Sequence, residues 1–243
     1  MFRFDKRIIY AIVAIIVVGI LLRYMSNMSA LLDLLISIPA VLIAITFHEF
    51  AHAFAAYKLG DDTAKIQGRM SLNPLKHLDP IGIAMLLFLG FGWGRPVEVD
   101  SRNFNRNIST KKANAIVAAA GPIANLLLAI IFSIVMVLLV KFQSAAILTN
   151  RAMYTLMKIL NYTVSMNVGL GIFNLIPLPP LDGSKILSAF LPTKADMWFQ
   201  NNEQIFYMIF ILLWLTGIGS QICLSIHYRL VILVVKLFDY QFL

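Results

Sequence analysis

Residues 40–59 read AVLIAITFHEFAHAFAAYKL and contain the motif HEFAH, which runs from His48 to His52. On an α-helix, residues four positions apart lie on the same face, so the two imidazoles can meet one metal ion. Glu49 follows the first histidine and is placed to act as general base on a metal-bound water. The flanks of the motif are nearly free of charge, which predicts a helix in or near a bilayer. The alternative is that these three are polar packing residues, but ionisable groups in lipid are costly and need partners.

The composition is typical of a membrane protein rather than of a soluble domain. Hydrophobic residues make up 60% of the 243 residues and charged residues only 13%, and the mean hydropathy is +0.82. The net charge of +8 does not indicate nucleic-acid binding, because the sequence has no basic stripe interleaved with aromatic residues. Positive charge in membrane-flanking loops explains it more simply. The single cysteine, Cys223, excludes an internal disulfide and a thiolate metal cluster.

The first 59 residues predict two membrane helices. Three basic residues among the first seven precede an apolar run with no small-residue cleavage site, so we expect an uncleaved span at residues 8–25. A second helix is expected over residues 30–59 and ends at Gly60. Fourteen of the twenty basic residues fall on one side of the resulting topology. This bias predicts a cytoplasmic N-terminus and places HEFAH near the cytoplasmic side.

The segment between the second and third helices is not a plain loop. An apolar run that begins after Asp79 is too short to span a bilayer and is predicted to be re-entrant. Residues 92–99 read GWGRPVEV, in which Gly and Pro disfavour a helix and Val97 and Val99 alternate with Glu98. We therefore predict a small β-hairpin, whose open edge can pair with an extended substrate or be purely structural. His77 and Asp79 lack helical pairing with another ligand and are interpreted as structural or solvated.

Two polar residues of the later helices bear on the site. Asn125 lies in a long apolar helix at residues 113–140 and is expected to bond another helix or face a cavity. A helix over residues 154–181 ends in three prolines, and Asp182 follows at once in apolar surroundings. A catalytic zinc takes three protein ligands and leaves one position for water, and Asp182 is the best available third ligand. The alternative is that Asp182 caps the helix after it.

The remaining chain adds a span at residues 205–222 and a final apolar segment at 230–238 that either spans the bilayer or lies at its surface. The sequence thus predicts a membrane all-α protein, a polytopic helical bundle of about five to six spans, with a small re-entrant β-hairpin element between the second and third helices. We expect a single membrane metalloprotease domain over residues 1–243. Its parts are the N-terminal span at 8–25, a catalytic core at about 30–190 and C-terminal helices at about 203–240.

Five motifs in this order resemble the site-2 protease family of intramembrane zinc metalloproteases. They are HEFAH, Asn73-Pro74 to Asp79-Pro80, GWGRPV at 92–97, GPIAN at 121–125, and Asn174, Pro177 and Asp182-Gly183. The resemblance covers roughly residues 40 to 187 and implies a minimal form without a PDZ or CBS domain. It implies His48, His52 and Asp182 as ligands of one Zn²⁺ and Glu49 as catalytic base, and it places Asn125 near the active site. Asn125 is therefore a second candidate catalytic residue, which assists the metal in stabilising the oxyanion. It also implies that the 92–99 region, with Gly92, Gly94, Val97 and Val99, lies near the substrate.

The expected function is therefore hydrolysis of peptide bonds in membrane-spanning proteins, within or near the bilayer, by a zinc-activated water. Expected partners are a substrate with a transmembrane helix and the lipid bilayer, and no nucleic acid. The expected location is the cell membrane, as in a bacterial plasma membrane. Two alternatives remain open, a metal-binding transporter with the same polar residues along a permeation path, and a catalytically inactive membrane scaffold.

Overall fold

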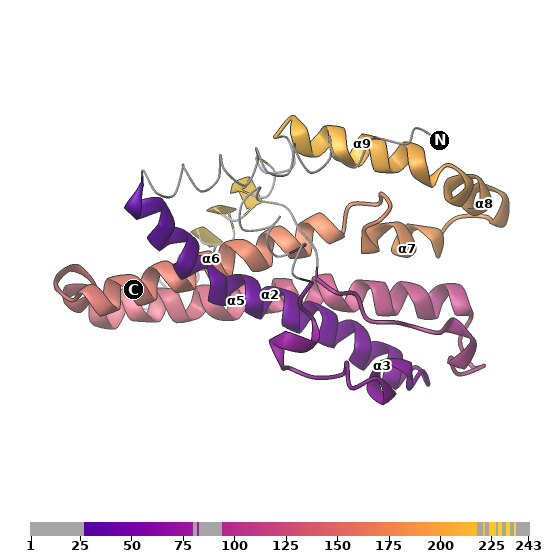
Figure 1. The fold of residues 1–243 in the computed structure, drawn as a ribbon, viewed down its shortest axis with the longest axis horizontal. Helices are drawn as coiled ribbons and strands as arrows, with labels where there is room; N and C mark the ends of the chain where they lie inside the picture. Colours follow the sequence, from indigo (N-terminus) through magenta and orange to yellow (C-terminus); the bar gives the residue numbers. More distant parts are fainter. Residues whose placement is uncertain are drawn as a thin grey trace, which may run out of the picture.

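The computed structural model describes residues 27–79, 82 and 94–217, with scattered residues between 221 and 236. Three long helices form its centre, α2 (Met28–Lys58), α5 (Thr110–Thr149) and α6 (Arg151–Asn174). α5 and α6 lie side by side along most of their length, and α2 packs against both (Figure 1). The shorter elements are α3 (Thr63–Ile66), η1 (Pro74–Lys76), η2 (Ser101–Asn103), α7 (Asp182–Ser188), α8 (Thr193–Asn201) and α9 (Glu203–Leu215).

The bounds of α2 follow from its two ends. At the start, the side chain of Asn27 accepts a hydrogen bond from the backbone N–H of Ala30 at 3.1 Å, which caps the first turn. At the end, Gly60 adopts a φ of +106°, and a Cβ atom there would lie 2.8 Å from Oδ1 of Asn105. Only glycine fits this turn, so the helix stops where the sequence predicted.

Small residues allow the three long helices to approach closely. Ala40, Ala44, Ala53 and Ala56 on α2 are at most 2% exposed. Two apolar clusters complete the core. One, near α3, is formed by Ala56, Phe104, Ala113 and Val117, and the other, between α5 and α6, by Ala129, Val164 and Val168.

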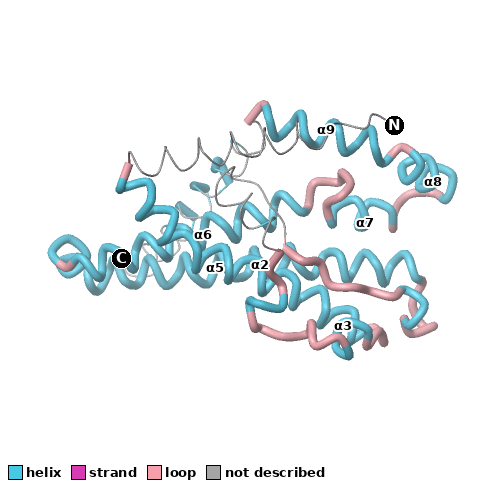
Figure 2. The backbone as a smooth tube through the Cα atoms, viewed as in Figure 1, coloured by secondary structure: helices cyan, strands magenta, loops and turns pink. Residues whose placement is uncertain are grey.

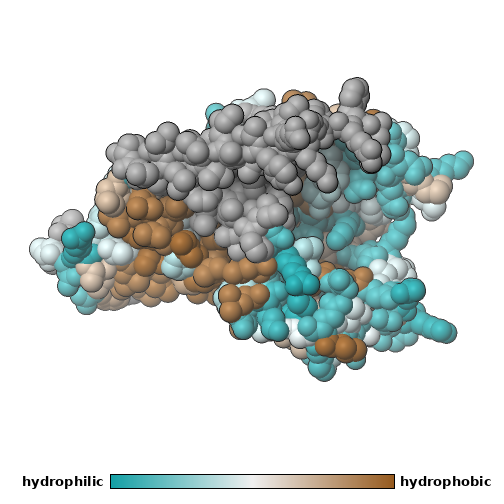
Figure 3. All heavy atoms as spheres, in the orientation of Figure 1, coloured by the Kyte–Doolittle hydropathy of each residue, from teal (hydrophilic) through white to brown (hydrophobic). Residues whose placement is uncertain are grey.

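The predicted number of about five to six spans is wrong for the part of the chain that the structure describes. Only two of its helices are long and apolar enough to cross a membrane, Met28–Lys58 and the first 34 residues of α5. α6 is long enough, but it carries Lys158, Asn161 and Asn167, which lower its hydropathy. Figure 3 shows apolar side chains over the region where α5, α6 and the start of α2 lie, and polar ones around α3.

The predicted β-hairpin is also wrong, since none of the described residues forms a strand (Figure 2). Residues 94–100, which we call the extended segment, have no regular secondary structure. Their backbone groups bond side chains and a loop instead of a second strand, because Glu49, Asp61 and Arg69 take the positions that a strand partner would occupy. The alternation of Val97 and Val99 therefore does not report a sheet.

Several predictions fall outside the described residues. They concern the span at 8–25, most of the apolar run at 80–91, Gly92 and most of the final segment at 230–238.

Candidate metal centre

Three ligand atoms converge between α2 and the start of α7. Nε2 of His48 and Nε2 of His52, one turn apart on α2, lie 3.0 Å from each other. Oδ2 of Asp182 lies 3.2 Å from the first nitrogen and 3.1 Å from the second. Both histidines are buried and Asp182 is nearly so. Among the described residues, these three form the one group of His, Cys, Asp and Glu side chains suited to a metal ion.

The hydrogen bonds of the histidines place a proton on the Nδ1 atom of each ring. Nδ1 of His52 lies 2.7 Å from the carbonyl oxygen of Val117, which only accepts, so this nitrogen donates. Nδ1 of His48 lies 2.7 Å from Oδ1 of Asn125 and donates to it. With both Nδ1 atoms protonated, the neutral rings present lone pairs at Nε2.

In the neutral form of both rings, three lone-pair atoms face one another, and Oδ2 of Asp182 is buried without a hydrogen-bond partner. A cation removes this conflict. Ligands bound tetrahedrally to zinc at about 2.0–2.1 Å lie about 3.3–3.4 Å apart, close to the distances observed. The donor set of two imidazoles and a carboxylate is typical of a catalytic zinc site with one open position. The residues present thus fit zinc.

Asp182 is the first residue of α7, and its carboxylate faces the histidines instead of capping the helix. The N-cap position belongs to Leu181, and no side chain caps this terminus. Gly183 permits the placement, since a Cβ there would lie 2.6 Å from the carbonyl carbon of Ile176. The carboxylate of Asp182 is therefore placed for a cation shared with the two histidines and not as a helix cap.

Glu49 lies beside this cluster and is buried. Its Oε2 accepts a hydrogen bond of 2.9 Å from the backbone N–H of Val97. Gly94 lies close to α2, because an added Cβ would be 2.6 Å from Cγ2 of Ile45 and 3.6 Å from Oε1 of Glu49. The extended segment therefore covers Glu49 and holds one of its two carboxylate oxygens.

A model of peptidase family M50 matches residues 36–217, which include every ligand of the cluster and Glu49. This chain belongs to peptidase family M50. The family, known as the site-2 proteases, consists of membrane-bound zinc metalloproteases, and the two apolar helices agree with a membrane protein.

Curated relatives agree with the family. A Bacillus subtilis protein named as a candidate zinc metalloprotease, YwhC, is 40% identical over 75% of this chain and 81% of its own length. The candidate zinc metalloprotease Rip2 of Mycolicibacterium smegmatis is 29% identical over 72% of this chain and 64% of its own length. A third, MJ0611 of Methanocaldococcus jannaschii, is 27% identical over 88% of this chain and 98% of its own length. No solved structure matches the chain.

In this M50 chain a buried carboxylate anchors the extended segment at its far end. Asp61 is fully buried and accepts from Thr63, from Nδ2 of Asn103 at 2.9 Å and from the backbone N–H of Asp100 at 2.8 Å. Burial raises the pKa of Asp61, but these hydrogen bonds outweigh it and keep the pKa below its usual range. Its neighbour Asp100 has a pKa lowered to about 2 by the side chain of Arg102.

The near end of the segment is held by Arg69 and His77. Arg69 donates to the carbonyl oxygens of Arg95 and Pro96, and the N–H of Arg95 donates to the carbonyl oxygen of His77 at 2.8 Å. His77 is fully buried, and its Nε2 lies 2.6 Å from the carbonyl oxygen of Ser71. His77 thus has a structural position, as interpreted from the sequence.

The other residues expected from the sequence have distinct surroundings. Asn125 is fully buried beside His48, and both hydrogens of its amide are used, by the carbonyl oxygen of Ala44 and by Oδ1 of Asn167. Asp79 accepts from the backbone N–H of Gly82 at 2.7 Å. Val99 packs against the apolar cluster near α3.

Sequence reasoning missed Asn167, Gly121, Arg69 and Asp61. Gly121 is decisive for the histidines, because a Cβ there would lie 2.6 Å from Cε1 of His52 and 2.7 Å from Cε1 of His48. The small residues before Asn125 indicated close helix packing, but nothing local showed that the histidines are what Gly121 makes room for.

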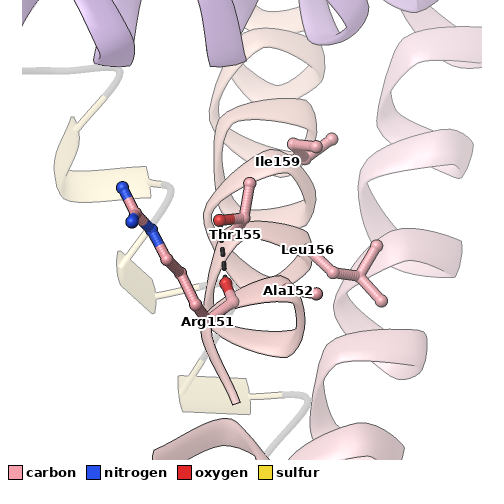
Figure 4. Close-up of a pocket in the computed structure, with 5 residues that line it drawn as sticks. All are labelled: Arg151, Ala152, Thr155, Leu156 and Ile159. Carbon is pink, nitrogen blue, oxygen red and sulfur yellow. Dashed lines mark hydrogen bonds between the residues drawn. The ribbon is translucent and has the colours of Figure 1, made fainter.

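A cavity of about 560 Å³ lies elsewhere, along the first turns of α6, at the other end of that helix from Asp182 (Figure 4). Arg151, Ala152, Thr155, Leu156 and Ile159 line it. This set lacks a metal ligand and a carboxylate, so the cavity is separate from the metal centre.

Proposed function

We propose that this chain hydrolyses peptide bonds of membrane-spanning proteins within or near the bilayer, with His48, His52 and Asp182 as zinc ligands and Glu49 as general base. One observation carries this proposal, the convergence of three potential ligand atoms beside a buried glutamate. Zinc bound there supplies a Lewis acid that lowers the pKa of a water and polarises a carbonyl.

The protein's own residues supply the proton transfers. Glu49 takes a proton from the attacking water as the water oxygen bonds to the substrate carbonyl carbon. Glu49 then delivers a proton to the leaving amine as the C–N bond breaks. Among the described residues, only Val97 donates to the Glu49 carboxylate, at Oε2, so Oε1 is available for the proton. Asp182 and the Nδ1–H bonds of the two histidines keep the site in the form that binds a cation.

The extended segment is the proposed contact for the substrate backbone, with Gly94, Val97 and Val99 as the candidate residues, together with Gly92, which precedes the segment in the sequence. A membrane helix hides its carbonyls in hydrogen bonds, so a substrate has to unwind before cleavage. In the described part of the chain, the backbone groups of Glu98 and Val99 have no hydrogen-bond partner. They can bond an unwound chain beside Glu49.

We further propose that residues 1–243 act as one membrane unit of a bacterial plasma membrane, with a cytoplasmic N-terminus and the site near the cytoplasmic side. The basic residues that follow the HEFAH helix support this sidedness. Nine of them lie from the last residue of α2 to the first turn of α5, namely Lys58, Lys65, Arg69, Lys76, Arg95, Arg102, Arg106, Lys111 and Lys112.

The test is cleavage of a model single-span substrate in proteoliposomes. We expect the wild type to cut it, and Glu49→Gln to reduce the rate by about 10²–10⁴-fold while zinc content is unchanged. Glu203→Gln, an exposed glutamate of α9, is the matched control and should cut normally. Undiminished turnover by Glu49→Gln would remove the catalytic assignment. A zinc-loaded wild type that cuts no substrate would favour the scaffold or transporter alternative.

A further inference from the structure

A chain of buried amides connects His48 to the middle of α6. Oδ1 of Asn125, on α5, accepts from His48, and Nδ2 of Asn125 donates to Oδ1 of Asn167 at 2.9 Å. Nδ2 of Asn167 in turn donates to the carbonyl oxygen of Thr163 at 2.8 Å. Both asparagines are fully buried. The hydrogen bonds thus cross from α2 through α5 to α6.

The direction of every bond in this chain is fixed from its far end. The carbonyl oxygen of Thr163 only accepts, so Asn167 must turn its NH₂ group there and its oxygen toward Asn125. Asn125 must then turn its NH₂ group toward Asn167 and toward the carbonyl oxygen of Ala44, 2.9 Å away. Its oxygen is left for His48, whose Nδ1 must therefore hold the proton.

Reversing the amide of Asn125 would place like groups opposite each other on both sides of that side chain. If Asn125 were flipped, its oxygen would face the carbonyl of Ala44 and the oxygen of Asn167, and its NH₂ group would face a protonated nitrogen of His48. Such unmatched groups are costly in a buried site, where no water can replace the lost partners. Asn167 and the carbonyl oxygen of Ala44 thus together select the tautomer of His48, which Asn167 does not touch.

We propose that Asn167 is a positioning residue, which acts through Asn125 to hold His48 in the Nδ1–H tautomer and so presents the Nε2 lone pair to the metal. The metal part of this inference rests on the proposed function. His52 needs no such help, because its Nδ1 donates directly to the backbone of Val117. A substitution at Asn167 should therefore affect one histidine and leave the other unchanged.

The experiment compares Asn167→Leu with Thr163→Val in purified, detergent-solubilised full-length protein. Thr163 is the matched control, since it is similarly buried one turn away on α6 and, among the described residues, its hydroxyl bonds only the carbonyl oxygen of Ile159. Zinc affinity is measured by competition with a chromophoric chelator, and Co²⁺ absorption reports the ligand geometry. Side-chain ¹⁵N shifts of labelled histidines report the tautomers in metal-free protein, with resonances assigned from single histidine variants.

We expect Asn167→Leu to weaken zinc binding about tenfold, to change the Co²⁺ spectrum and to shift His48 away from the pure Nδ1–H tautomer, with His52 unchanged. Thr163→Val should match the wild type in all three. Asn167→Asp, which keeps an oxygen for Asn125 to donate to, should restore part of the affinity. If Asn167→Leu does not fold, Asn167→Ala serves with the same measurements.

Unchanged affinity and an unchanged His48 tautomer in the Asn167 variant would overturn the inference, as would equal losses in both variants. A wild type that binds no zinc would contradict the proposed function instead. The tautomer measurement needs no metal, so it would still decide the role of Asn167.

Discussion

The histidines and Glu49 are neighbours on α2, yet their surroundings are held by different kinds of interaction. On the histidine side, the partners are a backbone carbonyl and two neutral amides inside the three-helix bundle. On the Glu49 side, the extended segment is held by the charged groups of Arg69 and Asp61, which lie beyond the end of α2.

This difference predicts that one set of contacts serves metal binding and the other serves turnover. Neutral, fully buried hydrogen bonds do not change with pH or salt, so the metal ligands keep one geometry. On the second side Asp61 titrates at acidic pH, so the cover over Glu49 can respond to pH. Substitutions on the first side should therefore affect metal binding, and those on the second side should affect turnover with the metal still bound.

The largest effect is expected at Gly121, where a side chain would break the histidine side. In Gly121→Ala the new Cβ would contact both imidazoles at distances that real Cβ atoms do not show, so the rings must move. We expect zinc affinity to fall on the order of a hundredfold. Equilibrium competition with a chelator measures it.

Gly169 in α6 is the matched control, because an added Cβ there has no neighbour within 4 Å. Gly169→Ala should bind zinc like the wild type and be slightly stabilised, since alanine favours the helix. Equal zinc affinities of the two variants would show that Gly121 does not shape the site.

A smaller effect is expected at Asp61, which tests the Glu49 side. Asp61→Asn places an NH₂ group among the N–H donors that the carboxylate accepts, so it should loosen the extended segment. We expect cleavage to fall about tenfold in kcat/KM with zinc affinity unchanged. Asp62→Asn, an exposed neighbour, should cut normally. Loss of zinc in Asp61→Asn would contradict the division between the two sides.

The pH dependence of the same anchor follows from its pKa. The folded-state pKa of Asp61 is below its usual range, so its contribution to stability is present above about pH 4 and is lost as the pH falls through the folded pKa. The difference in thermal stability between the wild type and Asp61→Asn should therefore be full above about pH 4 and shrink below it, which thermal unfolding over a pH series can measure.

The smallest effect is expected at the ion pair between Lys111 on α5 and Asp196 on α8, where Nζ and Oδ2 are 2.6 Å apart. Lys111 holds the pKa of Asp196 below its usual range, so this stabilisation is also lost at acidic pH. Lys111→Ala should cost less than about 1 kcal/mol, because Lys111 is partly exposed. Lys112→Ala is the control. At pH 7 Lys111→Ala should have a lower thermal unfolding temperature than Lys112→Ala, and this difference should disappear below the pH range in which Asp side chains titrate.

The helical parts of the site were predictable from the sequence. The spacing of His48 and His52 fixes their common face, and Gly60 marks the end of the helix. Asp182 could be identified because it is an acid in apolar surroundings directly after three prolines. These features depend on neighbours in the sequence, which a single chain displays.

The remaining features depend on contacts between distant segments. The extended segment has the alternation of a strand, yet its partners are Glu49, Asp61 and Arg69, which no local pattern connects to it. The polar residues of α6 lower its hydropathy, but Asn167 lies inside the bundle and accepts a hydrogen bond from Asn125. Single-sequence patterns do not reveal such pairings.

The most direct test of the central claim is the zinc content of the detergent-purified wild type beside His48→Ala. We expect about one zinc per chain in the wild type and loss of it in the variant, because His48 supplies one of three protein ligands. Absence of zinc from the wild type, after metal-free handling and zinc re-addition, would contradict the account and require another explanation for three facing lone pairs at His48, His52 and Asp182.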